Sequence, residues 1–438
     1  MSSIAFVGVG VVDVEAGQTR DRQTVIVRDK YIQDLGPMDE LQPPADAFQI
    51  DGRGKVLIPG LADMHVHITP HAPSPGVDED EALRRAREFL LVCLASGVTT
   101  IRNMAGTPLH LKLRDEVATG VTIGPRILSC GPVLETRFTF AELAEFGELV
   151  RTPEEGRAAV RSHKLAGFDF IKVYNDIDAN IYDTIIDEAR KIGIPVVGHV
   201  AFQKGLFGAL EAKQDSIEHL RSYDFAVDTR SGDIPRARFE GWLYATPQRI
   251  SELAERTAEA GVWNAPTLVV ERSLRTDEEM NEARQPIPEE VPDWLKRELE
   301  ASDLEPLFTS TQREVLGAGR DARAAMVNAL DDVRAGLLAG SDCPGCRLVP
   351  GRSLLRELEL FVDAGLSPAR ALLTATTSAQ QFLGCRNAGR VAPGMRADLV
   401  LLDRDPLVDI KALHQQAGVV VAGHWLPKEE LARRLLGS

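Results

Sequence analysis

The segment LADMHVHI, residues 61–68, decides the fold class because it joins a short apolar strand pattern to a pair of histidines. A Pro59-Gly60 turn precedes it, and turns of this kind separate one element from the next. His65 and His67 are two residues apart, so on a β-strand both imidazoles point to the same side. The segment therefore predicts a strand whose carboxyl end presents two imidazoles that can share one metal ion.

The middle of the chain repeats this pattern, with short apolar strands that alternate with amphipathic helices. The predicted strands are Leu61–His67, Val98–Arg102, Arg126–Ser129, Phe170–Tyr174, Pro195–His199, Ser216–His219, Trp263–Leu268 and Leu337–Gly340. The predicted helices are Asp80–Ala95, Thr152–Ala166, Asn180–Lys191, Pro247–Ala260 and Ser310–Ala335. This alternation predicts an α/β fold whose central part, residues 59–389, is a (β/α)8 TIM barrel.

Both ends of the chain are instead rich in Val and Ile between Gly and Asp turns. Strands are predicted over Ile4–Val14, Thr24–Arg28, Tyr31–Leu35, Asp398–Leu402 and Val419–Val421. Because these β-rich ends flank the α/β middle, residues 1–58 and 390–438 are expected to meet in one small β-sandwich domain. The acidic, proline-containing stretch Pro286–Leu307 is interpreted as an insertion after the seventh strand, with a lid as one possible role.

Composition narrows the class of protein. The chain has 438 residues, 44% of them hydrophobic, and a formal net charge of −15. The hydrophobic content is ordinary for a protein with a real core, and the negative charge argues against a nucleic-acid surface and, more weakly, against anionic membranes. No apolar run is long enough to span a bilayer, and the N-terminus lacks the basic region of a signal peptide. The expectation is a cytoplasmic enzyme with no nucleic-acid or membrane partner.

The five cysteines do not form a disulfide framework, because they are odd in number and sparse in a long chain. Cys343 and Cys346 have the CxxC spacing, but a structural zinc site would want a second pair, and a thioredoxin-type motif would lie early in a small domain. We expect ordinary reduced thiols in a loop.

Polar side chains that can bind metal recur at the ends of the predicted strands. Besides the two histidines of the first strand, Lys172 lies in DFIKVY, His199 ends PVVGH, His219 ends DSIEH, and Asp342 follows LLAGS. In a barrel the catalytic groups come from the carboxyl ends of the strands. The repeated position therefore indicates one site to which several strands contribute.

Each of these residues also has an ordinary structural interpretation. A lone histidine at a strand end is more often a hydrogen-bonded structural residue than a ligand, although the paired His65 and His67 make that less so. Lys172 cannot be buried charged and unpaired without great cost, so its alternative is an ion pair with a buried carboxylate. Asp342 could simply cap the loop that follows it.

The order of motifs resembles a known family. The motifs are IPGLADMHVHI (58–68), GVTTIRNMAGTP (97–108), GPRI (124–127), DFIKVY (169–174), PVVGHV (195–200), DSIEHL (215–220), GSDCPG (340–345), AGLSPARALLTATTSAQQFLG (364–384) and GMRADLVLLDRDPLVDI (394–410). Together they resemble the amidohydrolase superfamily, and most of all its imidazolonepropionase-like group, which includes Xaa-Pro dipeptidases. The resemblance extends from about residue 50 to 425.

The resemblance implies a binuclear centre of two divalent metal ions, with zinc as the first choice because imidazoles dominate the ligand set. His65, His67 and Asp342 would bind the buried metal, and His199 and His219 the more exposed one. Lys172 would be carboxylated by CO₂ and would bridge the two metals. Asp342 would also be catalytic, taking a proton from a metal-activated water and passing it to the leaving group.

The substrate is less well defined by the sequence. Tyr223, Tyr174, Arg221 and Arg347 are candidate substrate-binding residues, with a surface-loop tyrosine as the alternative for Tyr223. The expected reaction is cleavage of an amide or peptide bond in a small carboxylate-bearing molecule, such as a dipeptide or an N-acyl amino acid. The enzyme is expected to be a homo-oligomer.

Other activities remain open at this point. On the same metal centre they are hydrolysis of a carbamate, urea or ester xenobiotic, or phosphotriesterase or lactonase activity. A mononuclear deaminase is disfavoured, because such relatives carry Glu three residues after the fifth-strand histidine and this chain has Phe202 there. A non-catalytic relative is disfavoured because every expected ligand is present.

Overall fold

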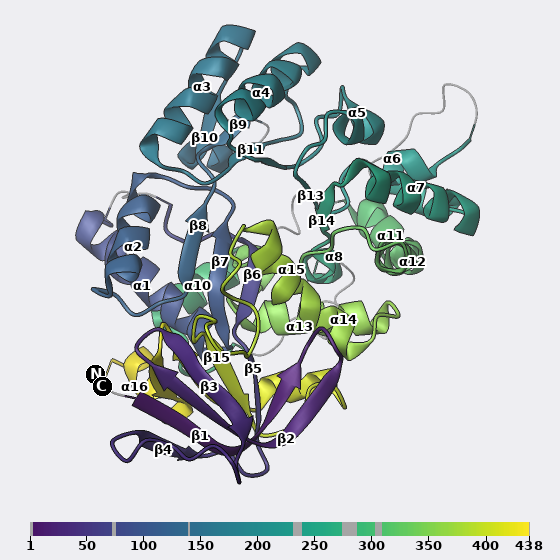
Figure 1. The fold of residues 1–438 in the computed structure, drawn as a ribbon. Helices are drawn as coiled ribbons and strands as arrows, with labels where there is room; N and C mark the ends of the chain where they lie inside the picture. Colours follow the sequence, from purple (N-terminus) through teal and green to yellow (C-terminus); the bar gives the residue numbers. More distant parts are fainter. Residues whose placement is uncertain are drawn as a thin grey trace.

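The terminal segments of the chain form one sheet. The structure, a computed structural model, describes residues 3–71, 76–138, 141–230, 239–273, 287–302 and 309–437. Eight strands pair in the order β17-β16-β15-β5-β1-β2-β3, and β4 adds to β1. Their bounds are β1 Ser3–Asp13, β2 Gln18–Arg28, β3 Tyr31–Pro37, β4 Phe48–Asp51, β5 Val56–Pro59, β15 Leu399–Leu402, β16 Gln416–Val421 and β17 His424–Pro427. Strands from the two ends of the chain therefore pair in the same sheet (Figure 1).

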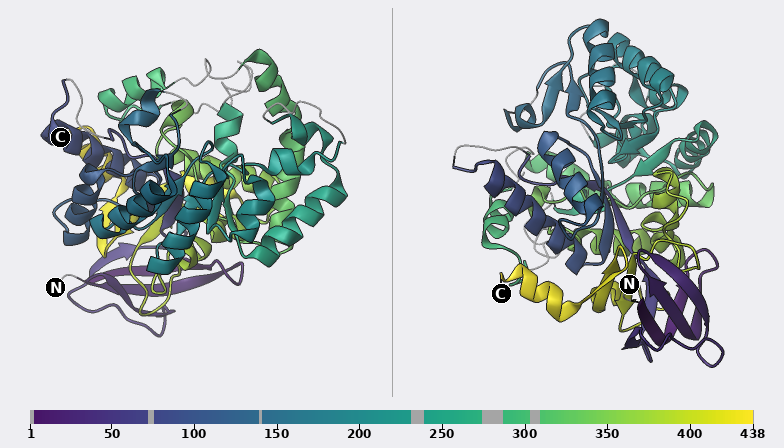
Figure 2. Two further views of the ribbon diagram at one scale, coloured as in Figure 1. Left: turned by 90° about the horizontal axis from the view of Figure 1, so that it is seen from above. Right: turned by 60° about the vertical axis from the view of Figure 1, so that its left-hand side comes forward.

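β5 and β15 connect the two ends of the chain. β15 pairs antiparallel with β5, so that Val400 lies opposite Ile58, and β5 pairs parallel with β1. β5 leads through Gly60 into the first strand of the central region, which ties the terminal sheet to the rest of the molecule. In the right-hand view of Figure 2 the yellow C-terminal segment, with α16 (Lys428–Leu435), lies next to the purple N-terminal strands.

The central region contains parallel strands in two sheets. One has the order β6-β7-β8 and the other β10-β9-β11-β12-β13-β14. Their bounds are β6 Leu61–Val66, β7 Val98–Asn103, β8 Arg126–Ser129, β9 Val133–Glu135, β10 Gly147–Leu149, β11 Ile171–Val173, β12 Val196–Gly198, β13 Ser216–Glu218 and β14 Trp263–Ala265. Seven of the predicted strands are present, six of them within one residue of the predicted bounds at each end, whereas β14 ends three residues before its predicted end; β9 and β10 were not predicted. The fold class is α/β with parallel sheets.

Isolated backbone bridges lie at the margins of these sheets. Cys130 bridges Phe170, Asn264 bridges Leu337, and Val66 bridges Cys343, all in parallel orientation. The predicted eighth strand, Leu337–Gly340, consists of such a bridge and no regular ladder. Its backbone bonds go to two different neighbours, since Leu338 N donates to Asn264 O at 2.9 Å and Ala339 O accepts from Met64 N at 2.9 Å.

Helices follow the strands along the chain. Those of the central region are α1 Glu79–Ala95, α2 Pro108–Thr119, α3 Pro153–Ala166, α4 Ala179–Ile192, α5 Gly205–Glu211, α6 Tyr223–Val227, α7 Pro247–Ala260, α8 Leu268–Ser273, α10 Asp293–Ala301, α11 Ser310–Ala318, α12 Arg320–Asp332, α13 Arg352–Asp363, α14 Pro368–Thr374 and α15 Thr377–Phe382. α3 shows why the sequence predicts them. Thr152 caps its start by accepting from Glu155 N, Pro153 occupies the first turn, and Gly167 ends it at a φ of 93°.

The predicted helix Ser310–Ala335 is wrong as a single element. It is divided at Gly319 into α11 and α12. A side chain at Gly319 would meet Trp242 Cβ at 2.7 Å, so the backbone passes close to a neighbouring segment at this point. A tertiary contact of this kind leaves no trace in the apolar periodicity of the helix.

The stretch interpreted as an insertion contains a packed helix. In α10, Leu295 and Leu299 are fully buried, and the Trp294 indole donates to Glu88 of α1. Ser302 Oγ contacts Pro344 O at 3.3 Å and Arg347 N at 3.2 Å, which fixes the end of the helix near the loop that follows Leu337–Gly340. Both ends of the predicted range, Pro286 and Leu307, lie outside the described residues.

Candidate active site

His65 lies at the centre of the candidate site. It ends the apolar part of β6, and its side chain is fully buried. Its Nε2 lies 3.2 Å from Asp342 Oδ1 and 3.5 Å from Lys172 Nζ. Its Nδ1 lies 2.9 Å from Glu218 Oε2 on the other side. The ring therefore faces the site with one nitrogen and a buried carboxylate with the other.

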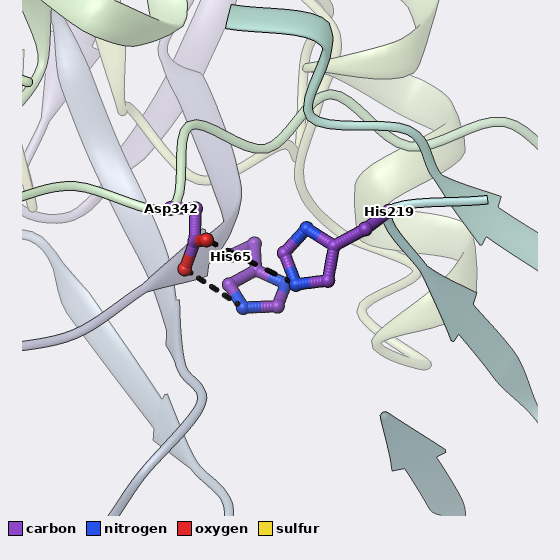
Figure 3. A group of neighbouring side chains, drawn as sticks. All are labelled: His65, His219 and Asp342. Atoms are coloured by element: carbon purple, nitrogen blue, oxygen red, sulfur yellow. Dashed lines mark ion pairs between the residues drawn. The ribbon is translucent and has the colours of Figure 1, made fainter. Parts of the chain in front are cut away.

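Asp342 brings the strand ends together. Its Oδ1 is shared by His65 and by His67 Nε2 at 3.1 Å, and its Oδ2 lies 3.9 Å from His219 Nε2. One ligand atom from each of His65, His219 and Asp342 lies within 4.8 Å of the others, an arrangement that suits a metal ion (Figure 3). Two imidazoles and a carboxylate from separate elements form a typical zinc-type donor set.

His199 and His219 are each held by a polar partner behind the ring. His219 Nδ1 lies 2.6 Å from Thr267 Oγ1, and His199 Nδ1 lies 2.9 Å from Asn175 Oδ1. The two ring centroids are 4.8 Å apart. Within the described part of the chain, the buried His199 Nε2 has no hydrogen-bond partner. A buried nitrogen without a partner is costly, and one whose other nitrogen is oriented by an amide has the geometry of a metal ligand.

Lys172 lies on β11, and its amine nitrogen lies 3.5 Å from His65 Nε2. It is 2% exposed, and burial lowers the pKa of its amine. No carboxylate of the described residues lies within ion-pairing distance, 4.0 Å, of its Nζ. The Asp342 charge acts on Lys172 from a greater distance and raises the pKa of the amine, against the larger effect of burial. A buried amine that is shifted toward neutrality is available for reaction or for ligation.

A buried ion pair between Arg102 and Glu218 lies on the Nδ1 side of the His65 ring. Arg102 Nη2 donates to Glu218 Oε1 at 2.8 Å, and all of these side chains are fully buried. Burial alone would raise the pKa of Glu218, but the Arg102 charge and the His65 hydrogen bond lower it to about 2. Glu218 is therefore an acceptor only, so His65 must carry its proton on Nδ1. That leaves the Nε2 lone pair facing Asp342 and Lys172.

Burial also shifts the pKa values of the three other histidines of the site. Burial, with the nearby Lys172 charge, lowers the pKa of His67 to about 4. Burial also takes the pKa values of His199 and His219 well below their usual range. Neutral imidazole is the form that binds metal, so the site favours ligation at neutral pH.

Tyr223 does not occupy the position predicted for a substrate contact. Its side chain is fully buried in the main core, and its hydroxyl lies 2.8 Å from Thr257 Oγ1 of α7. The loop turns after His219 through Leu220 and Ser222, both at positive φ, which directs the Tyr223 ring into the helix layer. Tyr223 is a packing residue, and neither the substrate-binding nor the surface-loop interpretation fits.

Two of the three other candidates, Tyr174 and Arg221, lie near the histidines. The Tyr174 ring stacks on the His199 ring at 4.1 Å between centroids and an interplanar angle of 25°. Arg221 lies close enough for its charge to lower the pKa values of His199 and His219. Among the described residues, the buried Nε atoms of Arg221 and Arg347 have no hydrogen-bond partner.

The sequence did not identify the residues that orient the candidate metal-binding histidines. They are Glu218, Arg102, Asn175 and Thr267. Glu218 had a local signal, since it is a carboxylate inside the apolar segment SIEHL directly before a predicted ligand. Thr267 had none, because its partner His219 is 48 residues away in the chain.

The comparisons with known proteins agree with this geometry. The family model described as "Amidohydrolase family" matches residues 56–426, which is most of the chain. The chain belongs to the amidohydrolase family. The resemblance found in its motifs is thereby confirmed, and the protein is an enzyme, a hydrolase of the kind that acts on carbon–nitrogen bonds.

Similar proteins cover nearly the whole chain. Ochratoxinase from Aspergillus niger is 22% identical, over 95% of this chain and 85% of its own. The structure of a bottromycin amidohydrolase is 25% identical with a TM-score of 0.74, covering 99% of this chain and 88% of its own. The structure of a Xaa-Pro dipeptidase is 20% identical with a TM-score of 0.71, covering 97% and 99%. At 20% identity the last shows the fold alone.

The structure bears on two further expectations. All five cysteines are free and buried, as expected of reduced thiols. In the described ranges, no helix combines the length and the apolar character that a membrane crossing requires.

Proposed function

We propose that this enzyme is a binuclear metal-dependent hydrolase that cleaves an amide or peptide bond in a small carboxylate-bearing substrate. The observation that carries the proposal is the buried, unpartnered His199 Nε2 beside the cluster of His65, His219 and Asp342. The cluster supplies donors for one divalent ion, and the additional imidazole lone pair supplies a donor for a second. The substrate need not resemble that of any relative, because function resides in the site and not in the fold.

The ligand assignment is the one that the family resemblance implies. His65, His67 and Asp342 would hold the buried metal, with zinc the first choice, and His199 and His219 the exposed one. Lys172 would link them after carboxylation, in which its nitrogen attacks the carbon of CO₂, one N–C bond forms and one proton is released. The resulting carbamate is an anion. The burial and lowered pKa of Lys172 support this step, since only the neutral amine is nucleophilic.

When bound, divalent metals supply an activated water near neutral pH and polarise the scissile carbonyl. Asp342 performs the proton transfer. Its Oδ1 lies 3.2 Å from His65 Nε2 and 3.1 Å from His67 Nε2, whereas the histidine nearest its Oδ2 among the described residues is His219, at 3.9 Å. Oδ2 is therefore the oxygen that would accept the proton of the attacking water and donate it to the departing amine nitrogen. A carboxylate that shuttles a proton in this way acts as general base and then general acid.

Arg221 and Arg347 would bind the carboxylate of the substrate. A guanidinium matches a carboxylate in a two-pronged geometry, and its Nε–H is one of the donors used. The buried Nε atoms of both residues have no partner in the described part of the molecule, so a bound anion would satisfy them. Tyr174, stacked on His199, would line the same pocket.

The predicted barrel and domain division belong to the same proposal. The bridges Cys130–Phe170, Asn264–Leu337 and Val66–Cys343 support a (β/α)8 ring in which the strands continue from β8 to β11, from β14 to Leu337 and back to β6. Residues 59–389 would form this barrel. Residues 1–58 and 390–438 would form the accessory β domain, which supports the first barrel strand through β5.

Elemental analysis of the purified chain tests the metal centre, with Lys172→Ala as the variant and the exposed Lys164→Ala as the matched control. About two metals per wild-type chain, with loss in Lys172→Ala only, is the expected result. Labelling with ¹³C-bicarbonate should give a carbamate resonance in the wild type and none in Lys172→Ala. One metal that is unchanged by Lys172→Ala would overturn the binuclear centre.

Matched substrate pairs test the reaction. N-acyl amino acids and Xaa-Pro dipeptides are compared with the same molecules carrying a carboxamide in place of the carboxylate. We expect amine release from the acids and a 10- to 100-fold lower kcat/KM for the carboxamides, about the value of one charged hydrogen-bonded pair. Equal turnover of both members of each pair would contradict carboxylate recognition, and release of ammonia from a ring amine would indicate deamination instead.

A further inference from the structure

The support of His199 depends on one loop, residues 174–178. Asn175 of this loop holds His199 Nδ1 through its amide oxygen at 2.9 Å, and Tyr174 stacks on the same imidazole. Asn175 O also accepts from Phe202 N at 2.8 Å, which ties the loop to the segment after His199. The direction of His199 Nε2 is therefore set by where this loop lies.

A separate segment, Glu135–Arg137, holds the loop in place. Glu135 Oε2 accepts from Asp176 N at 3.0 Å, and Thr136 Oγ1 accepts from Asp178 N at 3.2 Å. Arg137 Nη2 donates to Asp176 Oδ1 at 2.9 Å. Three successive side chains of one segment thus bind two residues after Asn175, namely Asp176 in the loop and Asp178, which directly precedes α4.

Glu135 is the buried member of this group. It has no exposed surface, and its second oxygen accepts from Thr136 N at 2.9 Å. Burial raises the pKa of this carboxyl to about 7, while the two backbone bonds oppose that shift. A buried carboxyl group is costly to retain, and here its hydrogen bonds are made to main-chain N–H groups that fix the loop.

We propose that Glu135 is a positioning residue that fixes His199 as a metal ligand through the loop 174–178. The connection passes from Glu135 to the Asp176 amide, then through the adjoining peptide to Asn175, and from its side chain to His199 Nδ1. Glu135 touches neither substrate nor metal in this arrangement. The inference rests on the proposed function, since it assigns His199 to the second metal.

Chelator competition tests the proposal, because it measures metal affinity without relying on turnover. Glu135→Ala removes the bond to Asp176, and Glu135→Gln keeps one carbonyl oxygen to accept it. Glu148→Ala is the matched control, since Glu148 lies on the adjacent strand β10 but binds His163 of α3 and not the loop. Residues that orient a ligand typically contribute 10- to 100-fold in metal affinity.

We expect Glu135→Ala to lose one of two metals at a roughly tenfold lower chelator concentration than the wild type. Glu135→Gln should recover most of that difference, and Glu148→Ala should match the wild type. Arg137→Ala removes the ion pair to Asp176 from an exposed side chain, so it tests the same support without disturbing a buried group. It should shift the loss of that metal in the same direction by a smaller factor.

Two outcomes separate this inference from the proposed function. A wild-type chain that holds two metals, with Glu135→Ala and Arg137→Ala equally resistant to chelator, overturns the positioning role alone. A wild-type chain that holds no second metal overturns the proposed function, and the positioning role falls with it.

Discussion

The buried ion pair between Arg102 and Glu218 predicts a large loss of stability when one partner is removed. Arg102 makes further bonds from Nε to Met64 O at 2.6 Å and from Nη1 to Ser216 Oγ at 2.9 Å. Its guanidinium also lies 5.1 Å from the centre of the Phe382 ring. No water can replace these contacts, because all of the charged atoms are shielded from solvent.

Arg102→Met keeps much of the side-chain volume and removes the charge. Glu218 would then be a buried anion without its cation, and the Met64 carbonyl would lose its donor. Breaking a buried pair in this way typically costs about 3 to 5 kcal/mol in the free energy of unfolding. The pair between Arg87 and Glu116, whose side chains are 39% and 15% exposed, is the matched comparison, and Arg87→Met should cost about 0 to 1 kcal/mol.

Urea-induced unfolding followed by tryptophan fluorescence measures the difference. Trp263 lies 5.7 Å from Phe382, so its emission reports on the packing around Arg102. Arg102→Met/Glu218→Gln should recover part of the loss, because the uncompensated charge is gone. A loss below about 1 kcal/mol in Arg102→Met, equal to that of Arg87→Met, would refute the reasoning.

Three further predictions follow from the site and its surroundings. Tyr223→Phe should leave the metal content and kcat/KM unchanged and cost about 1 kcal/mol in unfolding free energy, since the hydroxyl bond to Thr257 is lost; a fall in kcat/KM would return Tyr223 to the substrate pocket. Arg221→Ala should raise KM for carboxylate substrates about 10- to 100-fold with a smaller change in kcat, and should not affect the carboxamide analogues; steady-state kinetics on both series would reveal an equal effect if Arg221 is only structural. Glu135→Gln should change the pH dependence of stability. The pKa of Glu135 is raised from 4.5 to about 7, so between these values the folded protein binds more protons than the unfolded chain, and wild-type stability falls as pH rises. The variant should lack this fall, which amounts to at most about 3 kcal/mol, and urea midpoints that run parallel from pH 5 to 8 would contradict it.

The sequence predicts which residues lie at the strand ends of this protein. The carboxyl end of a strand can be recognised from neighbouring residues alone, because a polar side chain there directly follows an apolar segment. His65, Lys172 and His199 each fall at or next to the carboxyl end of an apolar segment, and those segments are β6, β11 and β12. Ligand type and strand polarity together then indicate one shared site. No long-range contact has to be known for this step.

The parts that the sequence could not predict depend on contacts between distant segments. The predicted helix is divided at Gly319, where Trp242 packs closely against the backbone. The Tyr223 ring lies in the core, where its hydroxyl contacts Thr257 Oγ1. Arg102 and Glu218 pair across 116 residues of chain. Each of these residues has an ordinary local context, so its role is fixed only when the strands are assembled.

Backbone strain distinguishes two of the candidate ligands from the strand residues around them. His219 has a φ of 59° and Asp342 a φ of 58°, in the left-handed region that residues with a side chain rarely adopt. Such conformations cost on the order of 1 to 3 kcal/mol and persist only where the surroundings determine them. Here Asp342 N donates to His65 O at 2.7 Å, and His219 N donates to Ala265 O at 2.9 Å, so both residues are still bonded to a neighbouring strand when the chain turns. The turn brings His219 Nε2 and the Asp342 carboxylate over His65, which a straight continuation of either strand would not do. Since a glycine would relieve the strain at either position but offer no ligand atom, the cost is best explained by the chemistry of the site.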